Sequence, residues 1–68
     1  MGNSNNNSEL LQLPGVTRKR EQRLRECGYV SLWDVADADI DQLTEDLEIT
    51  KSLAQQMIQT AQYLVTHE

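Results

Sequence analysis

The sequence predicts an all-α fold, a compact domain of five helices joined by short loops, and three observations support this. No segment shows a convincing alternation of polar and apolar residues with the period of two that strands require. Residues suited to helix capping recur along the chain, each followed by apolar residues at helical spacing. The 68 residues allow one domain with one core, near the lower size limit for folding on a core alone.

The first two predicted helices flank a break at Pro14-Gly15. Ser8 is a suitable N-cap for a short helix that begins the ordered part of the chain. Proline cannot continue a helix and glycine admits left-handed backbone angles, so this helix is expected to end at the break. Thr17 is expected to cap the next helix, over residues 18–27, and Gly28 to end it.

Three further helices are expected in the second half of the chain. Ser31 caps a short helix with Asp34 as its capping-box partner, Asp39 caps a fourth helix, and Thr50 caps the last and longest one. The last helix carries one apolar stripe, formed by Ala54, Met57, Ile58, Ala61 and Val65. The residues expected to fill the core are Leu13, Val16, Leu24, Tyr29, Val30, Leu32, Val35, Ile40, Leu43, Leu47, Ile49, Ala54, Ile58 and Ala61.

Residues 1–8 (MGNSNNNS) are polar and contain no apolar anchor, so we expect a disordered tail before the domain. They lack the basic and apolar regions of a signal peptide, and no apolar run in the chain approaches the roughly 18–20 residues of a membrane span. We therefore expect a cytoplasmic or nucleoid-associated protein that is not secreted and has no membrane partner.

The residues that carry most enzyme chemistry are scarce. One cysteine and one histidine cannot complete a four-ligand zinc site, so we expect no metal site and no cofactor. The chain has no nucleophile–base pair and no phosphate-binding P-loop, and its carboxylates fall on short helices rather than in a cleft. We expect no catalytic residues, no enzymatic activity and no small-molecule substrate.

Two segments of the chain align at an offset of 33 residues. Val16-Thr17-Arg18 and Ile49-Thr50-Lys51 each place an aliphatic residue, a threonine and a basic residue where a short helix ends and a longer one begins. Leu24 and Met57 follow the two threonines by seven positions. Because a helix–turn–helix unit of this size cannot bury its apolar face alone, we expect two such units to pack about a pseudo-twofold axis.

The segment Leu13-Pro14-Gly15-Val16-Thr17-Arg18-Lys19, followed by Leu24, resembles the helix-hairpin-helix motif. The stretch from Leu24 to Ala36 resembles the connection between the hairpins of tandem helix-hairpin-helix domains. The resemblance implies such a domain, of five helices, over residues 9–66. Similar domains form the N-terminal domain of archaeal and eukaryotic RecA-like recombinases and the C-terminal repeats of a bacterial Nus-type elongation factor, where the partner is protein.

The resemblance also implies that backbone amides of the hairpin turn bind a DNA phosphate. A helix N-terminus attracts anions, and a glycine lets the backbone approach them closely. The residues expected to contact phosphate are Gly15, Val16, Thr17, Arg18 and Lys19, with Thr50 and Lys51 assisting from the second hairpin.

Both hairpins depart from the usual motif, which is a hydrophobic residue, Gly, a hydrophobic residue, Gly, then Ala four residues on. In the first hairpin Thr17 replaces the second glycine and Glu21 replaces the alanine. In the second, Glu48 and Thr50 replace the two glycines, whereas Ala54 is in place. Glu48 puts a carboxylate beside the turn, so phosphate binding by the second hairpin is left open.

The charges are segregated along the chain. Six basic and eleven acidic residues give a net charge of −5. The net charge alone argues against a nucleic-acid partner, because an acidic protein repels phosphate at long range. However, five of the bases fall between residues 18 and 25, whereas segment 34–48 carries seven acids and no base. Arg20, Arg23 and Arg25 are expected to add long-range attraction for phosphate.

Two functions follow from this arrangement. The first is a non-sequence-specific DNA-binding module that contacts the phosphate backbone through the first hairpin, in DNA repair, recombination or processing. The DNA could be duplex, branched or single-stranded. The alternative is a protein-interaction module without nucleic-acid binding, whose acidic middle segment docks a basic protein partner. Its expected contact residues are Trp33, Asp37 and Asp41.

Overall fold

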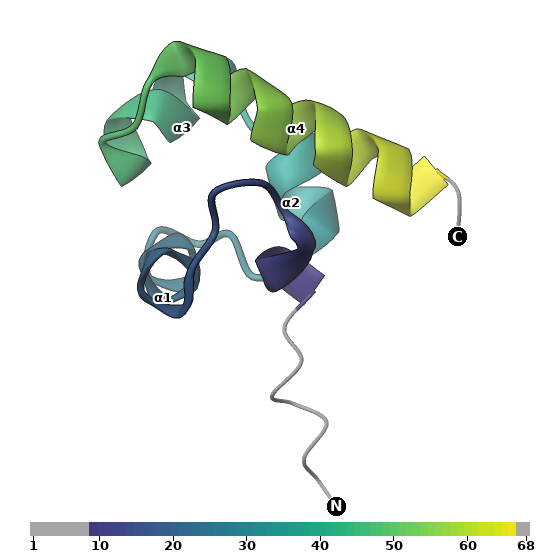
Figure 1. Cartoon of the computed structure of the whole chain (residues 1–68), viewed down its shortest axis with the longest axis horizontal. Coiled ribbons are helices and arrows are strands. Elements are labelled where there is room, and N and C mark those ends of the chain that lie inside the picture. Colours follow the sequence, from purple (N-terminus) through teal and green to yellow (C-terminus); the bar gives the residue numbers. More distant parts are fainter. Residues whose placement is uncertain (1–8, 67–68) are drawn as a thin grey trace, which may run out of the picture.

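The computed structural model describes residues 9–66, and this part of the chain is entirely helical, without strands (Figure 1). It contains a 3-10 helix, η2 (Glu9–Gln12), and four α-helices. The α-helices are α1 (Arg18–Glu26), α2 (Leu32–Ala36), α3 (Ile40–Leu47) and α4 (Lys51–Thr66). The all-α prediction is confirmed, and the predicted tail, residues 1–8 with the Ser8 cap, lies outside the described residues.

Five helices were predicted, and the described chain has four α-helices preceded by a 3-10 helix in place of the first. The backbone after η2 continues with bonds of the 3-10 spacing: Leu13 N–H donates to the Leu10 carbonyl, and Val16 N–H donates to the Leu13 carbonyl. Pro14 has no N–H to donate and ends the helix early. Only one tight turn can therefore form there.

Three of the four predicted N-caps in the described chain are confirmed. The Thr17 hydroxyl accepts a hydrogen bond from the Arg20 N–H at 3.3 Å, and the Thr50 hydroxyl accepts one from the Leu53 N–H at 3.1 Å. Ser31 forms the predicted capping box with the carboxylate three residues later. Asp39 occupies the predicted N-cap position of α3, but its carboxylate makes no hydrogen bond to the first turn of the helix.

Helices α1 and α3 end in the same way. Gly28 lies in the left-handed region with φ 98°, and the N–H of Tyr29 donates to the Leu24 carbonyl at 2.8 Å. At the end of α3, Glu48 takes the left-handed position with φ 56°, and the N–H of Ile49 donates to the carbonyl five residues earlier at 3.2 Å. These bonds are those of a Schellman motif, which glycine usually closes. A glutamate therefore occupies a backbone conformation that side chains rarely adopt.

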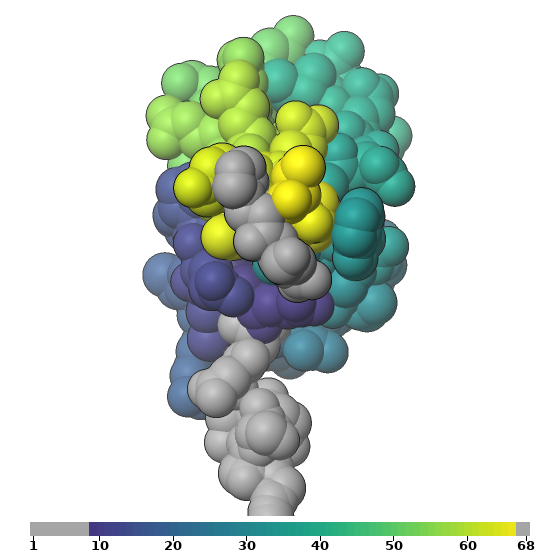
Figure 2. Space-filling model, turned by 90° about the vertical axis from the view of Figure 1, so that its right-hand side faces the viewer, coloured from purple at the N-terminus to yellow at the C-terminus, as the bar shows by residue number. Residues whose placement is uncertain are grey.

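The core lies where the two hairpins and α2 meet. Helix α4 packs on α2 and α3, and α1 packs on α3 and η2. Residues 33 positions apart take matching places: Leu10 and Leu43 are fully buried, and so are Leu24 and Met57. The predicted internal repeat is therefore visible in the packing. Helix α2 lies between α4 and η2 (Figure 1), and Figure 2 shows the molecule from the side of the C-terminal end of α4.

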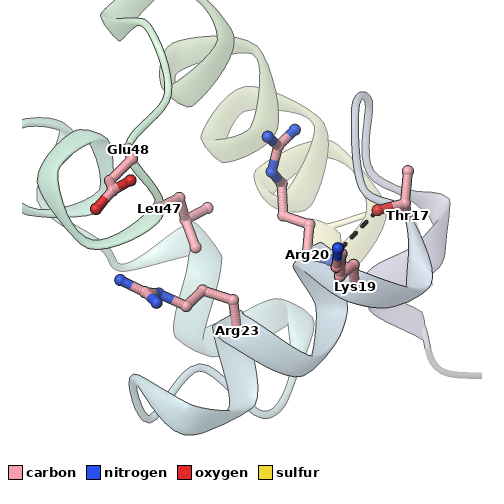
Figure 3. Close-up of a pocket in the computed structure, with 6 residues that line it drawn as sticks. All are labelled: Thr17, Lys19, Arg20, Arg23, Leu47 and Glu48. Atoms are coloured by element: carbon pink, nitrogen blue, oxygen red, sulfur yellow. Dashed lines mark hydrogen bonds between the residues drawn. The ribbon is translucent and has the colours of Figure 1, made fainter.

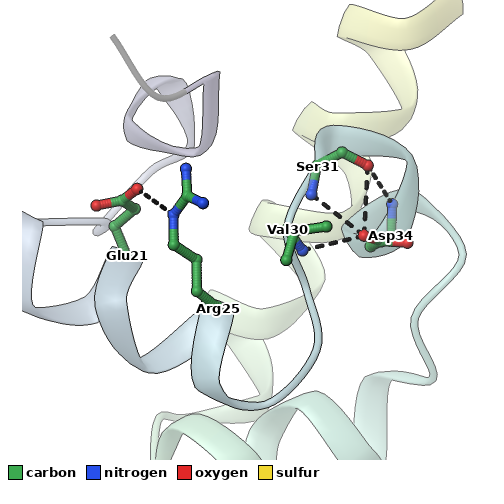
Figure 4. Close-up of polar contacts among 5 residues, drawn as sticks. All are labelled: Glu21, Arg25, Val30, Ser31 and Asp34. Atoms are coloured by element: carbon green, nitrogen blue, oxygen red, sulfur yellow. Dashed lines mark hydrogen bonds and ion pairs between the residues drawn. The ribbon is translucent and has the colours of Figure 1, made fainter. Parts of the chain in front are cut away.

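Most of the predicted core residues are buried or packed against the core, but Val30 is a wrong prediction with 53% of its surface exposed. The N–H of Val30 donates to the Asp34 carboxylate at 3.0 Å, which ties this residue to the outer side of α2 (Figure 4). The preceding Tyr29 packs against the core instead. The buried residues that the prediction left out are Leu10, Ala36 and Met57.

Candidate nucleic-acid interface

The turn of the first hairpin presents backbone N–H groups at the start of α1. Within residues 9–66 no acceptor pairs with the N–H groups of Thr17, Arg18 and Lys19. Gly15 enters this turn with φ 73°, and a Cβ on it would lie 3.1 Å from two methyl carbons of Leu53. The glycine therefore serves both the backbone conformation and the close packing of the turn against α4.

Arg18 and Lys19 stand beside these amides, and both side chains are exposed. Neither makes an ion pair within the described part of the chain. Their charges therefore add to the positive end of the α1 dipole rather than being neutralised by a neighbouring acid. The structure thus brings together Gly15, Thr17, Arg18 and Lys19 as predicted, whereas Val16 is half-buried against the core.

The three arginines predicted as electrostatic support are all engaged within the protein. The Arg20 guanidinium donates to the Gly15 carbonyl at 2.8 Å, which braces the hairpin turn. Arg23 Nε donates to the Asp46 backbone carbonyl at 3.0 Å, near the C-terminal end of α3 where the helix dipole is negative. These two bonds keep the positive charges of Arg20 and Arg23, because a carbonyl carries no net charge.

Arg25 differs from the other two arginines. Its Nε lies 2.7 Å from the Glu21 carboxylate, one turn earlier on α1 (Figure 4). The pair spans the i,i+4 spacing that suits such contacts on a helix surface. The positive charge of Arg25 is therefore offset by a neighbouring carboxylate. This pairing was foreseeable from the spacing of the two residues in the sequence.

The second hairpin has the same cap but different electrostatics. Lys51 Nζ lies 3.0 Å from the Asp41 carboxylate, and both side chains are well exposed. The structure therefore joins a residue predicted to bind phosphate to one predicted to contact a protein partner. Glu48 adds a second carboxylate at the turn. The turn at Thr50 and Lys51 is consequently flanked by two carboxylates, unlike the turn of the first hairpin.

An open cleft of about 260 Å³ lies between α1 and the end of α3 (Figure 3). Its lining residues are Thr17, Lys19, Arg20, Arg23, Leu47 and Glu48. The Arg23 side chain extends from α1 toward the end of α3, where Glu48 lies, and Arg20 lies on the Thr17 side (Figure 3). The prediction did not include this cleft, because its walls come from residues more than 20 positions apart in the sequence.

The acidic middle segment is partly used within the fold. The Asp34 carboxylate accepts bonds from the start of α2, and the Asp46 carboxylate accepts from the Tyr29 hydroxyl at 3.1 Å. Burial and this bond to Asp46 raise the pKa of Tyr29 to about 12. Asp37 is exposed at the end of α2. The seven acids therefore do not form a single free surface.

Trp33 is the most prominent of the residues predicted to contact a partner. It lies on α2 with 59% of its surface exposed, and Val30 and Tyr63 are the other large apolar residues exposed in the described chain. Asp37 is the first residue of the link between α2 and α3, and Asp41 lies in the first turn of α3. The structure thus leaves Trp33 and Asp37 accessible, whereas Asp41 is paired with Lys51.

Residues 9–66 contain no group of three or more histidine, cysteine, aspartate or glutamate side chains that could hold a metal ion. None of the helices in this part of the chain combines the length and apolar character needed to cross a membrane.

The comparisons with curated proteins and with solved structures give no match. A protein-family model does match: the SAM-like helix-hairpin-helix tandem aligns with residues 8–62. The hairpin turns at Gly15 and Glu48, the two threonine caps and the paired core positions all lie within this range. This chain therefore belongs to the SAM-like helix-hairpin-helix tandem family.

Proposed function

We propose that this domain binds DNA without sequence specificity, by contacting the phosphate backbone through the first hairpin. Domains of this family commonly bind nucleic acid. The observation that carries the proposal is the group of N–H donors at Thr17, Arg18 and Lys19, which have no partner within residues 9–66 and stand beside two unpaired cations. Phosphate is the anion that such a helix N-terminus suits. The proposed role is binding without catalysis, in DNA repair, recombination or processing.

Fluorescence anisotropy of labelled DNA at low and moderate salt tests the proposal. If about four phosphates are contacted, log K falls against log salt with a slope of about −3 to −4 for duplex DNA. The double variant Arg18→Glu/Lys19→Glu should lower the affinity by at least about tenfold at low salt, because it reverses both free charges at the turn. Absence of binding by the unaltered protein at low salt would contradict the proposal.

Lys51→Glu is the matched control, because it reverses a base at the equivalent position of the second hairpin. Lys51 is already neutralised by Asp41 at 3.0 Å. Its reversal should therefore reduce affinity much less than reversal of either base in the first hairpin. An equal loss would show that general charge, rather than the first hairpin, governs binding.

A second candidate function, docking of a basic protein partner, is favoured by the 59% exposure of Trp33. Tryptophan is enriched at the energetic centres of protein interfaces. Asp37 beside it supplies a negative charge for a basic partner. A partner that docks there should shift the Trp33 emission, and DNA bound at the first hairpin should leave that emission unchanged.

A further inference from the structure

The cleft between α1 and the end of α3 combines groups that no single simple anion would satisfy. Lys19, Arg20 and Arg23 supply positive charge on one wall, and Glu48 supplies a carboxylate on the other (Figure 3). Leu47 adds apolar surface between them. A ligand that fits all of these carries a negative group, a flat apolar face and a hydrogen-bond donor.

The cleft lies directly beside the hairpin turn that is proposed to bind phosphate. Thr17 and Lys19 belong both to the hairpin turn and to the cleft lining. A strand whose phosphate is held by the turn amides therefore places an adjacent nucleotide at the mouth of the cleft. The volume of about 260 Å³ is just below the range of roughly 300–1,000 Å³ found for drug-sized ligands, which suits one nucleobase.

Glu48 is equipped to accept a hydrogen bond from that base. Within residues 9–66 its carboxylate takes part in no ion pair and no side-chain hydrogen bond. An ionised carboxylate can only accept, and among the pyrimidines it accepts from the exocyclic amino group of cytosine. The donor of thymine at its pairing edge is N3–H, which lies between two carbonyl oxygens, and the lone pairs of both carbonyls repel a carboxylate that approaches it.

The arginine side chains that line the cleft can stack on the faces of an unpaired base. The Arg20 and Arg23 guanidinium groups are held in place by their bonds to the carbonyls of Gly15 and Asp46, at 2.8 and 3.0 Å. Guanidinium planes and apolar side chains are the surfaces on which proteins stack splayed-out bases. A base inside a duplex could not enter, because its hydrogen-bonding edge is already paired.

We propose that the cleft holds one unpaired nucleobase of the bound strand and that Glu48 selects bases bearing an amino group over thymine. The proposal rests on the proposed function, since the first hairpin must hold the neighbouring phosphate. It narrows the ligand to DNA with a single-stranded segment. The preference between bases depends on the Glu48 carboxylate alone, so substitution of this one residue should abolish the preference.

The test compares the affinities for short homopolymers of deoxycytidine and deoxythymidine at neutral pH. Both are single-stranded pyrimidine chains with the same backbone, so their affinity ratio isolates the base. The unaltered protein should bind the cytosine strand several-fold more tightly, because the hydrogen bond from thymine N3–H is weakened by its two flanking carbonyls whereas the cytosine amino group has one flanking acceptor. Glu48→Gln should bring the ratio close to one, because an amide both donates and accepts.

Glu45→Gln is the matched control, because it removes the same charge from an exposed position on α3 outside the cleft lining. It should raise both affinities slightly and leave their ratio unchanged. A thymidine strand with one central guanine, compared with the same strand carrying inosine, provides an independent measurement. The guanine strand should bind more tightly, since inosine lacks the exocyclic amino group.

The outcomes separate the two proposals. Equal affinity of the unaltered protein for both homopolymers would overturn the cleft proposal while leaving phosphate binding intact. A preference that persists in Glu48→Gln would also overturn it. If neither homopolymer nor duplex binds, the proposed function itself is wrong. Circular dichroism of both glutamine variants confirms that the helices are retained.

Discussion

The first hairpin turns at Gly15 and the second at Glu48, and both residues lie in the left-handed backbone region with φ 73° and 56°. In each hairpin a threonine hydroxyl then caps the following helix. The surroundings of the two turns differ, because Gly15 packs against Leu53 whereas Glu48 opens onto the cleft. The glycine is therefore required by contact in one turn, and in the other a side chain has room at a cost in backbone strain.

The electrostatic difference between the hairpins is larger than the structural one. Arg18 and its neighbour Lys19 are unpaired within residues 9–66, whereas Lys51, the counterpart of Arg18, is paired with Asp41. Two units with the same backbone plan can thus differ in ligand affinity through a few surface charges. The fold depends on caps and packing that both units share, and these charges can change without disturbing it.

The largest expected effect comes from the packed turn. Gly15→Val should destabilise the domain by about 2–4 kcal/mol, because it adds left-handed strain and a clash with Leu53. Gly28→Val is the matched control, since Gly28 has φ 98° but a Cβ on it would meet no atom within 4 Å. It should cost only about 1–2 kcal/mol. Urea unfolding measures both, and equal losses would show that the contact with Leu53 has no energetic weight.

The second hairpin can be made more like the first. Asp41→Asn with Glu48→Gly frees Lys51 and restores a glycine turn, so affinity for duplex DNA should rise about tenfold at low salt with a salt slope steeper by about 1. The control, Asp37→Asn with Glu45→Gln, removes two charges elsewhere. Anisotropy that shows the same gain in both double variants would mean that only net charge matters.

The strain at the second turn should also be measurable. Glu48→Gly alone should stabilise the domain by about 0.5–1 kcal/mol, because glycine adopts φ 56° without steric cost. Glu45→Gly, inside α3, should instead destabilise it by about 0.5–1 kcal/mol. Thermal unfolding monitored by circular dichroism distinguishes these opposite signs, and a loss of stability in both variants would contradict the strain assignment.

The smallest effect concerns one of the hydrogen bonds between the two hairpins, from the Tyr29 hydroxyl to the Asp46 carboxylate. The pKa of Tyr29 rises from 10.0 to about 12 in the folded protein, so its protonated form is favoured by folding. The stability that this provides is present below pH 10 and is lost as the pH rises toward 12. Tyr29→Phe should flatten the fall in stability across this interval. A stability profile identical to that of the unaltered protein would contradict the raised pKa of Tyr29.

The sequence was most informative where structure is local. The caps at Thr17, Ser31 and Thr50 were predictable because each depends on a donor three residues away. The correspondence between Leu24 and Met57 was also visible in the internal repeat, although the predicted core included only Leu24 of the two. Such features need no knowledge of how distant segments meet.

Features set by distant segments could not be predicted in the same way. The bond from Arg23 to the Asp46 carbonyl and the pairing of Lys51 with Asp41 depend on the placement of helices relative to one another. The exposure of Val30 depends on which of two adjacent apolar residues turns inward after α1. Of the candidate site, the residues were therefore predictable, whereas the pairing of their charges and the cleft were not.

The packing of α2 on α4 bears on the kinetics of folding. Each hairpin closes over a short stretch of chain, but this contact spans the whole of α3 and requires a longer loop closure. Contacts of high sequence separation slow folding relative to local ones. Docking of α2 onto α4, rather than the formation of any helix, should therefore set the folding rate.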